Sequence, residues 1–267
     1  MPKITIILST LNRIKSVLRA ITSVQNQSLR DYEFIIVNDG STDGTDKILN
    51  KVANSDKRIK LFNNIVNIGL QKSLNFALSI AKADYIARID DDDEWIDLNK
   101  LEKQYNFLVK NPDYLLIGTA FTYNNVVFKN PISDKQIRKQ ILFRCPFHHS
   151  SVLFVRKNTN INVSYNENLL YAEDWELWLR IGLAGKMINL NDVAVKVSLG
   201  NNLSETHFLT QFENNHRFIK KYSKLYPFRR LAFLYHYLII LFFKVFPING
   251  VIHNFAKRFF QFIFNKI

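Results

Sequence analysis

The chain has 267 residues, of which 47% are hydrophobic and 22% are charged, and this composition excludes an intrinsically disordered protein. The formal net charge of +13 indicates a polyanionic partner: a nucleic acid, an anionic lipid surface or a phosphorylated ligand. Cys145 is the single cysteine, which excludes an intrachain disulfide, and we expect it to be a small buried hydrophobic side chain.

The first hundred residues alternate between strand and helix patterns. We expect strands at Lys3–Leu8, Glu33–Val37, Arg58–Phe62 and Tyr85–Ile89, and helices at Lys15–Gln25, Asp43–Val52 and Gln71–Ala81. Ser41 or Thr42 is available to cap the second of these helices. The alternation predicts an α/β fold with a mostly parallel sheet flanked by helices. Such sheets bind ligands at the carboxyl ends of their strands, and polar clusters follow three of these strands.

The strongest local signal is the run of four aspartates, Asp90–Asp93, in the segment IARIDDDDEW. It directly follows an apolar strand. Carboxylates that a strand delivers to a loop suit Mg²⁺ or Mn²⁺, because these cations prefer oxygen ligands. Four adjacent like charges also repel one another, so we expect a cation nearby. A solvated acidic turn is the alternative interpretation.

A second signal is Asp39, which ends the second strand in the segment VNDGSTDGT. Gly40 permits a sharp turn there and the close approach of a ligand to the backbone. A carboxylate in this position can accept a hydrogen bond from the N–H group of a nucleobase. An ordinary Asn-Asp-Gly turn is the alternative.

A third signal lies beyond residue 110, where the pattern is less regular, with strands expected at Tyr114–Thr119 and Ser151–Val155 and a helix at Asp174–Leu183. Asp174 opens this helix in the segment YAEDWELWLR. Aromatic neighbours partly desolvate a carboxylate and raise its pKa toward that of a useful base. The alternative is that Glu173 and Asp174 only favour the helix N-terminus through its dipole.

Together these segments resemble the family 2 glycosyltransferases with the GT-A fold. The matching text is ITIILSTLNR, EFIIVNDGSTDGT, NIGLQKSLNFALSIAKADYIARIDDDDEW, FHHSSVLFVRK and YAEDWELWLR, which extends over roughly residues 3–204. The resemblance implies an inverting, metal-dependent hexosyl- or N-acetylhexosaminyltransferase with a nucleotide-sugar donor. It also implies that residues 1–110 bind the nucleotide sugar, and that residues 111–204 bind the acceptor and contain the catalytic base.

On the donor side, the resemblance implies that Thr10, Leu11 and Arg13 line the nucleotide. Asp39 would read the uracil N3–H, which favours a UDP-sugar. The family often has a proline shortly after its aspartates, and EWIDL in this chain departs from that pattern.

At the reacting centre, the resemblance implies that Asp92 binds Mn²⁺ or Mg²⁺ directly, while Asp90 and Asp91 bind ribose or water. Asp174 would be the general base that takes the proton from the acceptor hydroxyl. The residues expected on the acceptor side are His148, His149 and Glu173. For each histidine a satisfied structural role is the favoured interpretation.

The last segment, residues 205–267, holds ten Lys or Arg residues against two acidic residues, together with 17 of the 36 aromatic residues. Basic side chains interleaved with Phe and Tyr suit an anionic lipid surface better than a nucleic acid groove. On a helical wheel Val251–Ile267 separates an apolar face from a polar one. We expect this helical extension to lie on an anionic membrane surface. Packing on the catalytic domain or on a second subunit is the alternative.

The longest apolar run, Leu231–Phe243, would extend over only about 20 Å as a helix, which is short of the roughly 30 Å hydrocarbon core. The segment after Met1 lacks the basic region and cleavage site of a signal peptide. We therefore expect a cytoplasmic protein, peripheral on the inner face of the cell membrane. Its acceptor would be a saccharide or a lipid-linked molecule in the synthesis of surface polysaccharide or lipopolysaccharide.

Three other classes of protein fit the sequence less well. A nucleotidyltransferase needs a glycine-rich basic phosphate loop near the N-terminus, and STLNR is not one. A dinucleotide oxidoreductase needs GxGxxG after the first strand, which this chain lacks. A catalytically degenerate membrane-binding scaffold is the remaining alternative, and the joint presence of Asp39, Asp92 and Asp174 argues against it.

Overall fold

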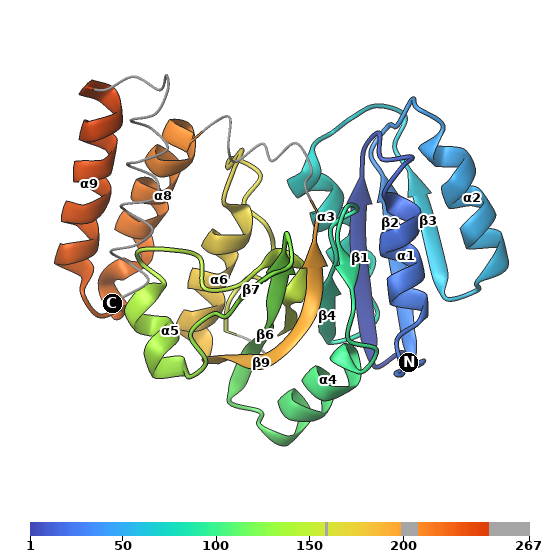
Figure 1. Ribbon diagram of the computed structural model, residues 1–267, viewed down its shortest axis with the longest axis horizontal. Helices are drawn as coiled ribbons and strands as arrows, with labels where there is room; N and C mark the ends of the chain where they lie inside the picture. Colours follow the sequence, from blue (N-terminus) through green and yellow to red (C-terminus); the bar gives the residue numbers. More distant parts are fainter. Residues whose placement is uncertain (158–159, 199–207, 246–267) are drawn as a thin grey trace.

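The computed structural model describes residues 1–157, 160–198 and 208–245. Within these residues one nine-stranded sheet carries helices on both faces (Figure 1). The strands are β1 Ile4–Thr10, β2 Tyr32–Asn38, β3 Ile59–Asn63, β4 Tyr85–Arg88, β5 Glu94–Trp95, β6 Tyr114–Tyr123, β7 Val126–Phe128, β8 Leu153–Val155 and β9 Lys186–Val197. The α-helices are α1 Val17–Gln25, α2 Thr45–Ser55, α3 Leu70–Ile80, α4 Lys100–Lys110, α5 Asp134–Gln140, α6 Glu173–Ala184, α8 Phe208–Tyr222 and α9 Arg229–Val245.

The first half of the sheet is parallel. Its strands lie in the order β3-β2-β1-β4, and β1 pairs along its whole length with β2, from Ile4 opposite Tyr32 to Thr10 opposite Asn38. The carboxyl ends of these four strands therefore meet at one edge, which is the edge where ligands bind in open α/β sheets.

The second half of the sheet is mixed. β8 runs antiparallel to both β4 and β6, β6 runs parallel to β9, and β5 pairs antiparallel with β9. β7 forms a hairpin on β6. Thus β5 follows β4 by a few residues in the sequence but lies at the far edge of the sheet. The chain between them, Ile89–Asp93, carries the aspartates across the end of the sheet.

Alternate residues of the parallel strands face two separate cores. Ile7 and Ile35 belong to the core that contains α3, α5 and α6, whereas Ile6 and Phe34 belong to the core that contains α1, α2 and α4. Because both faces are covered, the strands read as nearly continuous apolar runs and not as an alternating pattern.

The start of α2 differs from the expectation. The helix begins at Thr45 after Gly44, which has a left-handed backbone with φ 92°, so neither Ser41 nor Thr42 is its N-cap. The Asp43 carboxylate instead accepts the Thr45 N–H at 3.0 Å.

The extension contains α8 and α9. Phe218 and Ile219 of α8 and Ala232 of α9 are buried in the same core as α6. The run Leu231–Phe243 lies in α9, and within the described ranges no helix is long and apolar enough to cross a membrane. The predicted amphipathic helix at Val251–Ile267 lies outside the described residues.

Candidate active site

Asp39 lies at the carboxyl end of β2 and is 3% exposed. Its N–H donates to the Thr10 carbonyl at 2.8 Å, which ties it to β1. Its carboxylate accepts hydrogen bonds from Asn64 Nδ2 at 2.8 Å and from the N–H groups of Ile68 and Gly69, both at 3.0 Å. Within the part of the chain that the structure describes, Oδ1 accepts two of these bonds and Oδ2 one. One acceptor position on Oδ2 therefore remains for a ligand N–H.

Gly40 makes the turn after Asp39 possible. Its φ is 79°, a left-handed backbone that side chains rarely adopt, and a Cβ there would lie 2.7 Å from backbone atoms of Val66 and Asn67. The chain before α3 therefore passes directly over this glycine, on one side of Asp39.

The loops after β1 and β2 are joined by hydrogen bonds. Asn12, with φ 54°, donates its N–H to Ser41 Oγ at 2.9 Å, and its Oδ1 accepts the Thr42 N–H at 2.8 Å. Arg13 donates its N–H to Thr45 Oγ1 at 3.1 Å. These contacts fix the two strand ends as a single unit beside Asp39.

The three residues predicted to line the nucleotide follow β1. Thr10 is buried at the end of the strand, and Leu11 is partly exposed. The side chain of Arg13 reaches the acidic loop, where Nε lies 3.4 Å from Asp91 Oδ1 and Nη2 lies 3.8 Å from Asp92 Oδ2. Arg13 thus links the β1 loop to the aspartates that follow β4.

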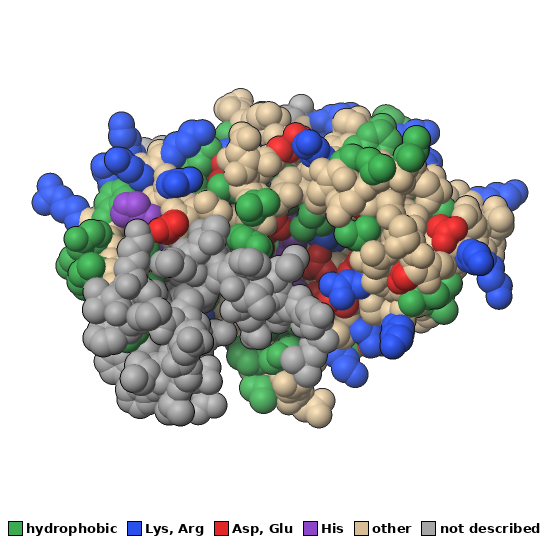
Figure 2. Space-filling view, turned by 90° about the horizontal axis from the view of Figure 1, so that it is seen from above, with side chains coloured by type: hydrophobic (Ala, Val, Ile, Leu, Met, Phe, Trp, Pro, Cys, Tyr) green, Lys and Arg blue, Asp and Glu red, His purple; other side chains and the backbone are tan. Residues whose placement is uncertain are grey.

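The negative charges of the acidic loop, Asp90–Asp93, act on one another. Burial raises the pKa of Asp91 to about 6, although the Arg13 charge acts in the opposite direction. Burial and the Asp90 charge raise the pKa of Asp92. Seen from above the strand ends, acidic side chains gather in a hollow near the middle of this face, beside Lys and Arg side chains (Figure 2). A bound cation would relieve this repulsion.

Glu173 and Asp174 begin α6, after Ala172 adopts a left-handed backbone with φ 60°. The Asp174 carboxylate accepts the Trp175 N–H at 2.7 Å. Burial raises the pKa of Asp174 to about 6, and the Asp90 charge contributes. Burial, with the neighbouring Asp174 charge, also raises the pKa of Glu173. The start of α6 therefore faces the acidic loop and holds a carboxylate with the strength of a useful base.

The two predicted histidines have different surroundings. His149 is buried, and its Nε2 lies 2.9 Å from the Tyr165 hydroxyl, while burial lowers its pKa to about 3. His148 contacts the acidic loop, with Nδ1 3.7 Å from Asp93 Oδ2, and its ring lies 4.8 Å from that of Phe121. It lines a cavity of about 620 Å³ beneath the β6–β7 hairpin. His149 therefore has the contacts of a structural residue, and His148 is open to a ligand.

Sequence reasoning missed Arg88, the last residue of β4. It is 1% exposed, and its Nη2 donates to Asp90 Oδ1 at 2.5 Å. Although burial acts in the opposite direction, the Arg88 charge lowers the pKa of Asp90 to about 2. A charged residue inside an otherwise apolar strand was the available signal, because such a residue needs a partner when it is buried.

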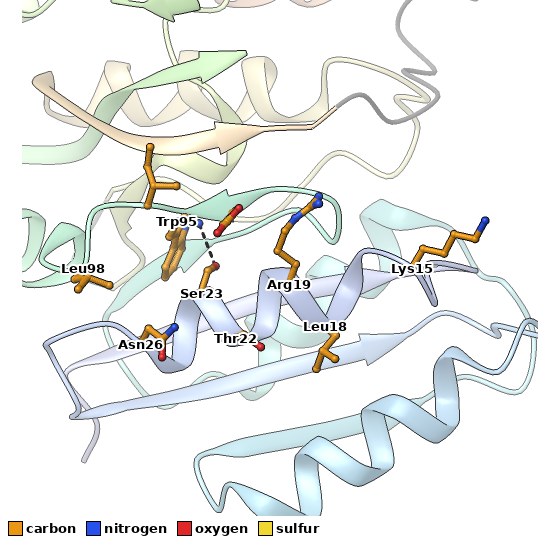
Figure 3. Close-up of a pocket in the computed structure, with 10 residues that line it drawn as sticks. Lys15, Leu18, Arg19, Thr22, Ser23, Asn26, Trp95 and Leu98 are labelled. Atoms are coloured by element: carbon orange, nitrogen blue, oxygen red, sulfur yellow. Dashed lines mark hydrogen bonds between the residues drawn. The ribbon is translucent and has the colours of Figure 1, made fainter. Parts of the chain in front are cut away.

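The acidic loop and the strand that follows it are also fastened to α1, and Figure 3 shows the contact of that strand, between Ser23 and Trp95. Arg19 Nη2 donates to the Asp92 carbonyl at 2.7 Å, and Ser23 Oγ accepts the Trp95 N–H at 3.0 Å. These residues line a cavity of about 540 Å³ between α1 and residues 94–98. Local sequence patterns do not indicate these contacts, because they join positions about 70 residues apart.

The acidic loop fits a divalent cation in its chemistry. Asp91 and Asp92 offer carboxylate oxygens, which Mg²⁺ and Mn²⁺ prefer. Within the described ranges, no group of three or more His, Cys, Asp or Glu side chains has the geometry of a metal site. One or two carboxylates together with substrate phosphates and water is a common coordination of Mg²⁺, so these residues fit a cation that binds with a phosphorylated substrate.

The model of the family described as Glycosyl transferase family 2 matches residues 5–169, which is more than half of the chain. The chain belongs to this family. The putative glycosyltransferase EpsE of Bacillus subtilis is 32% identical over 206 residues, which cover 73% of each chain. The amylovoran biosynthesis glycosyltransferase AmsE of Erwinia amylovora is 34% identical over 143 residues, which cover 51% of this chain and 53% of AmsE.

Solved structures resemble the fold of this family 2 glycosyltransferase. The structure of S. aureus TarS 1-349 in complex with UDP-GlcNAc has a TM-score of 0.70 and 19% identity, and the match covers 88% of this chain and 72% of that chain. This likeness confirms the expected GT-A fold. The residues that match the family model include Asp39 and the acidic loop, whereas Glu173, Asp174 and β9 lie beyond them.

Proposed function

We propose that this family 2 glycosyltransferase transfers a hexosyl or N-acetylhexosaminyl group from a UDP-sugar to a saccharide or lipid-linked acceptor, with inversion. The proposal rests on one arrangement: Asp39 and the acidic loop follow β2 and β4 at the same edge of the parallel sheet, and the Asp90 charge acts on Asp174 at the start of α6. The likeness to TarS, which was solved with UDP-GlcNAc, supports a UDP-sugar donor.

In this proposal residues 1–110 bind the donor. Asp39 accepts the uracil N3–H with the free position on Oδ2, and Thr10, Leu11 and Arg13 line the nucleotide. Asp90 and Asp91 bind ribose or water, and Asp92 holds Mn²⁺ or Mg²⁺. Such a cation acts as a Lewis acid that stabilises the charge of the departing diphosphate.

Residues 111–204 bind the acceptor in this proposal. Asp174 accepts the proton of the acceptor hydroxyl while that oxygen bonds to the anomeric carbon. The bond from the anomeric carbon to the UDP oxygen breaks, and its electron pair leaves with UDP. Because attack and departure occur on opposite faces, the anomeric configuration inverts. His148 and Glu173 contact the acceptor, and His149 supports this side through Tyr165.

The proposed setting is the synthesis of surface polysaccharide or lipopolysaccharide on the inner face of the cell membrane. The likeness to AmsE, an amylovoran biosynthesis enzyme, supports a polysaccharide product. The exposed face of α9 supports contact with a membrane. Its leucines recur at helical spacing and are each 45–52% exposed: Leu231, Leu234, Leu238 and Leu241. Exposed Arg229 and Arg230 at the start of α9 suit an anionic leaflet.

Flotation with liposomes tests the membrane contact. We expect the intact protein to float with anionic vesicles and not with zwitterionic ones, and the double variant Leu234→Glu, Leu238→Glu to stay in the soluble fraction. Ile65→Glu is the control, because Ile65 is 98% exposed on another part of the molecule. Equal flotation of all three proteins would show that α9 does not make this contact.

Release of UDP from a panel of UDP-sugars, with Mn²⁺ or with EDTA, tests the catalytic proposal. We expect turnover of one preferred sugar with Mn²⁺ and its loss in Asp92→Ala. Turnover that persists in EDTA would overturn the role of the metal. Absence of turnover and of binding with every UDP-sugar would contradict the assignment of Asp39, and GDP- or dTDP-sugars would be tested next. Inactivity with all donors would favour the alternative of a catalytically degenerate membrane-binding scaffold.

A further inference from the structure

The hydroxyl group of Ser150 contacts both ends of the acidic loop. Ser150 lies in the 3₁₀ turn His149–Ser151 and is fully buried. Its Oγ accepts the Asp90 N–H at 2.9 Å and lies 3.1 Å from Asp90 Oδ2 and 2.5 Å from Asp93 Oδ2. One oxygen atom from a segment about 60 residues away therefore fixes the first and the last aspartate of the run.

The backbone of the same turn adds to this attachment. The Ser150 carbonyl accepts a hydrogen bond from Trp95 Nε1 at 2.8 Å, which ties the turn to β5 just after the loop. Asp91 and Asp92, between the fixed ends, have their carboxylates near Arg13. Ser150 thus holds the two ends of the loop, and Arg13 contacts the two aspartates between them.

We propose that Ser150 is a positioning residue that shapes the acidic loop before the donor binds. This inference rests on the proposed function, in which Asp90, Asp91 and Asp92 bind the donor and its cation. Ser150 touches neither donor nor acceptor in this account; it acts through Asp90 and Asp93. Residues that orient metal-binding carboxylates typically change affinity or activity by about 10- to 100-fold when they are removed.

Ser151 provides a matched control. It is the next residue in the chain and is also fully buried. Its Oγ donates to the His148 carbonyl at 2.7 Å, inside its own turn. In the described part of the chain no hydrogen bond joins this hydroxyl to the acidic loop. Ser151→Ala therefore removes the same atom from the same turn as Ser150→Ala, and it leaves the loop untouched.

The test compares the full-length wild-type protein with Ser150→Ala and Ser151→Ala. Calorimetric titration measures the Kd of UDP in the presence of Mn²⁺, steady-state kinetics measure KM for the donor and kcat, and thermal melting measures Tm. We expect Ser150→Ala to raise the Kd of UDP and the donor KM by about 10-fold or more, and Ser151→Ala to change them by less than about twofold. A similar fall in Tm for both variants would show that stability does not explain the difference.

A double-mutant cycle shows whether Ser150 acts through Asp90. In the Asp90→Asn background we expect Ser150→Ala to add much less to the Kd than it does in the wild type, because contacting residues are not additive. If Ser150→Ala fails to fold, Ser150→Cys replaces it, since a thiol is a weaker hydrogen-bonding group of similar shape.

Equal changes in Kd for Ser150→Ala and Ser151→Ala, or an additive cycle, would overturn the inference while the proposed function stands. Failure of the wild-type protein to bind any nucleotide with Mn²⁺ would overturn the proposed function itself, and the inference with it.

Discussion

Two groups of carboxylates lie at the same end of the sheet, and their surroundings differ. Asp39 receives three hydrogen bonds, two of them from backbone N–H groups at the start of α3. Burial raises the pKa of Asp91, Asp92 and Asp174, and the negative charge of Asp90 raises each of them further.

Asp39 is therefore a carboxylate whose charge the folded chain itself compensates, whereas the charges of the other carboxylates are compensated when a ligand or a proton binds. The partners of Asp39 are built into the chain, so its position is fixed before the nucleotide arrives. The charges of the acidic loop and of α6 lower the free energy of unfolding of the ligand-free protein. They become favourable when a cation or a proton binds to them. The following predictions test this comparison.

The largest effect is expected for Asp174→Asn. Loss of a general base typically lowers kcat by about 10²- to 10⁴-fold, while the Kd of UDP with Mn²⁺ should not change. The same substitution should raise Tm at pH 8, because it removes a buried charge. The folded state binds the Asp174 proton more tightly than the unfolded state does, so stability falls as pH rises from about 4 to about 6 and stays lower above that.

A variant that lost activity and also lost stability would contradict the second half of this prediction. Asp134→Asn is a suitable control, because Asp134 begins α5 outside the site and pairs with Arg138 at 2.7 Å. It should leave kcat unchanged.

The next largest effect is a difference in the free energy of unfolding between Asp39→Ala and Asp92→Ala in the absence of nucleotide. Asp39→Ala leaves the Ile68 N–H without its acceptor, and an unsatisfied buried group costs about 1–3 kcal/mol. It also removes one acceptor from the Gly69 N–H and one from the Asn64 amide, which keep their bonds to Asn67 and Ser73. Among the described residues, the ion pair of the Asp92 carboxylate is a long contact with Arg13, at 3.8 Å, so its removal should not lower the free energy of unfolding. Urea unfolding of both variants measures the difference. Equal destabilisation would remove the distinction between the two groups.

A smaller effect is expected for Gly40→Ala. The left-handed backbone alone costs roughly 1–2 kcal/mol for a residue with a Cβ. The Cβ must also displace the backbone at Val66 and Asn67, which leads into the N–H groups that bind Asp39. We therefore expect lower stability together with a weaker Kd for UDP. Gly44→Ala is the control, because Gly44 also has a left-handed backbone, with φ 92°, but a Cβ there would lie 3.3 Å from the end of the Ile14 side chain and not against backbone.

The smallest effect is the pH dependence near neutrality. Asp174 must be ionised to act as a base, and burial raises its pKa to about 6. Transfer should therefore be constant above about pH 7, fall to half near pH 6 and drop about tenfold for each further unit. Steady-state kcat at saturating donor measures the profile. A base with an ordinary aspartate pKa would give a flat profile down to about pH 4.

Much of the donor half could be predicted from the sequence. The apolar runs of β1, β2 and β4 are buried on both faces, and polar residues follow each of them, so local pattern was enough to find Asp39 and the acidic loop. The contacts that hold the acidic loop in place were not predictable in the same way. Ser150 looks like any small polar residue in FHHSS, and its partner Asp90 is 60 residues away.

The mixed half of the sheet was harder to predict from the sequence, for a related reason. The segment NLND interrupts β9 with polar residues, and its apolar character is too weak to stand out. β9 is a strand because β6 pairs with it on one edge and β5 on the other. Pairing over such distances is a property of the folded chain, and no local pattern records it.

The position of β9 has a practical consequence for anyone who divides this chain. The match to the family model stops at residue 169, but β9 is an interior strand of the sheet that contains the matched strands. A polypeptide that ended at residue 169 would expose the full hydrogen-bonding edge of β6 and leave β5 without a neighbour. Bare edges of this kind recruit other chains, so we expect such a fragment to aggregate when expressed alone. The boundary of the homologous segment is therefore not a boundary at which the protein can be cut.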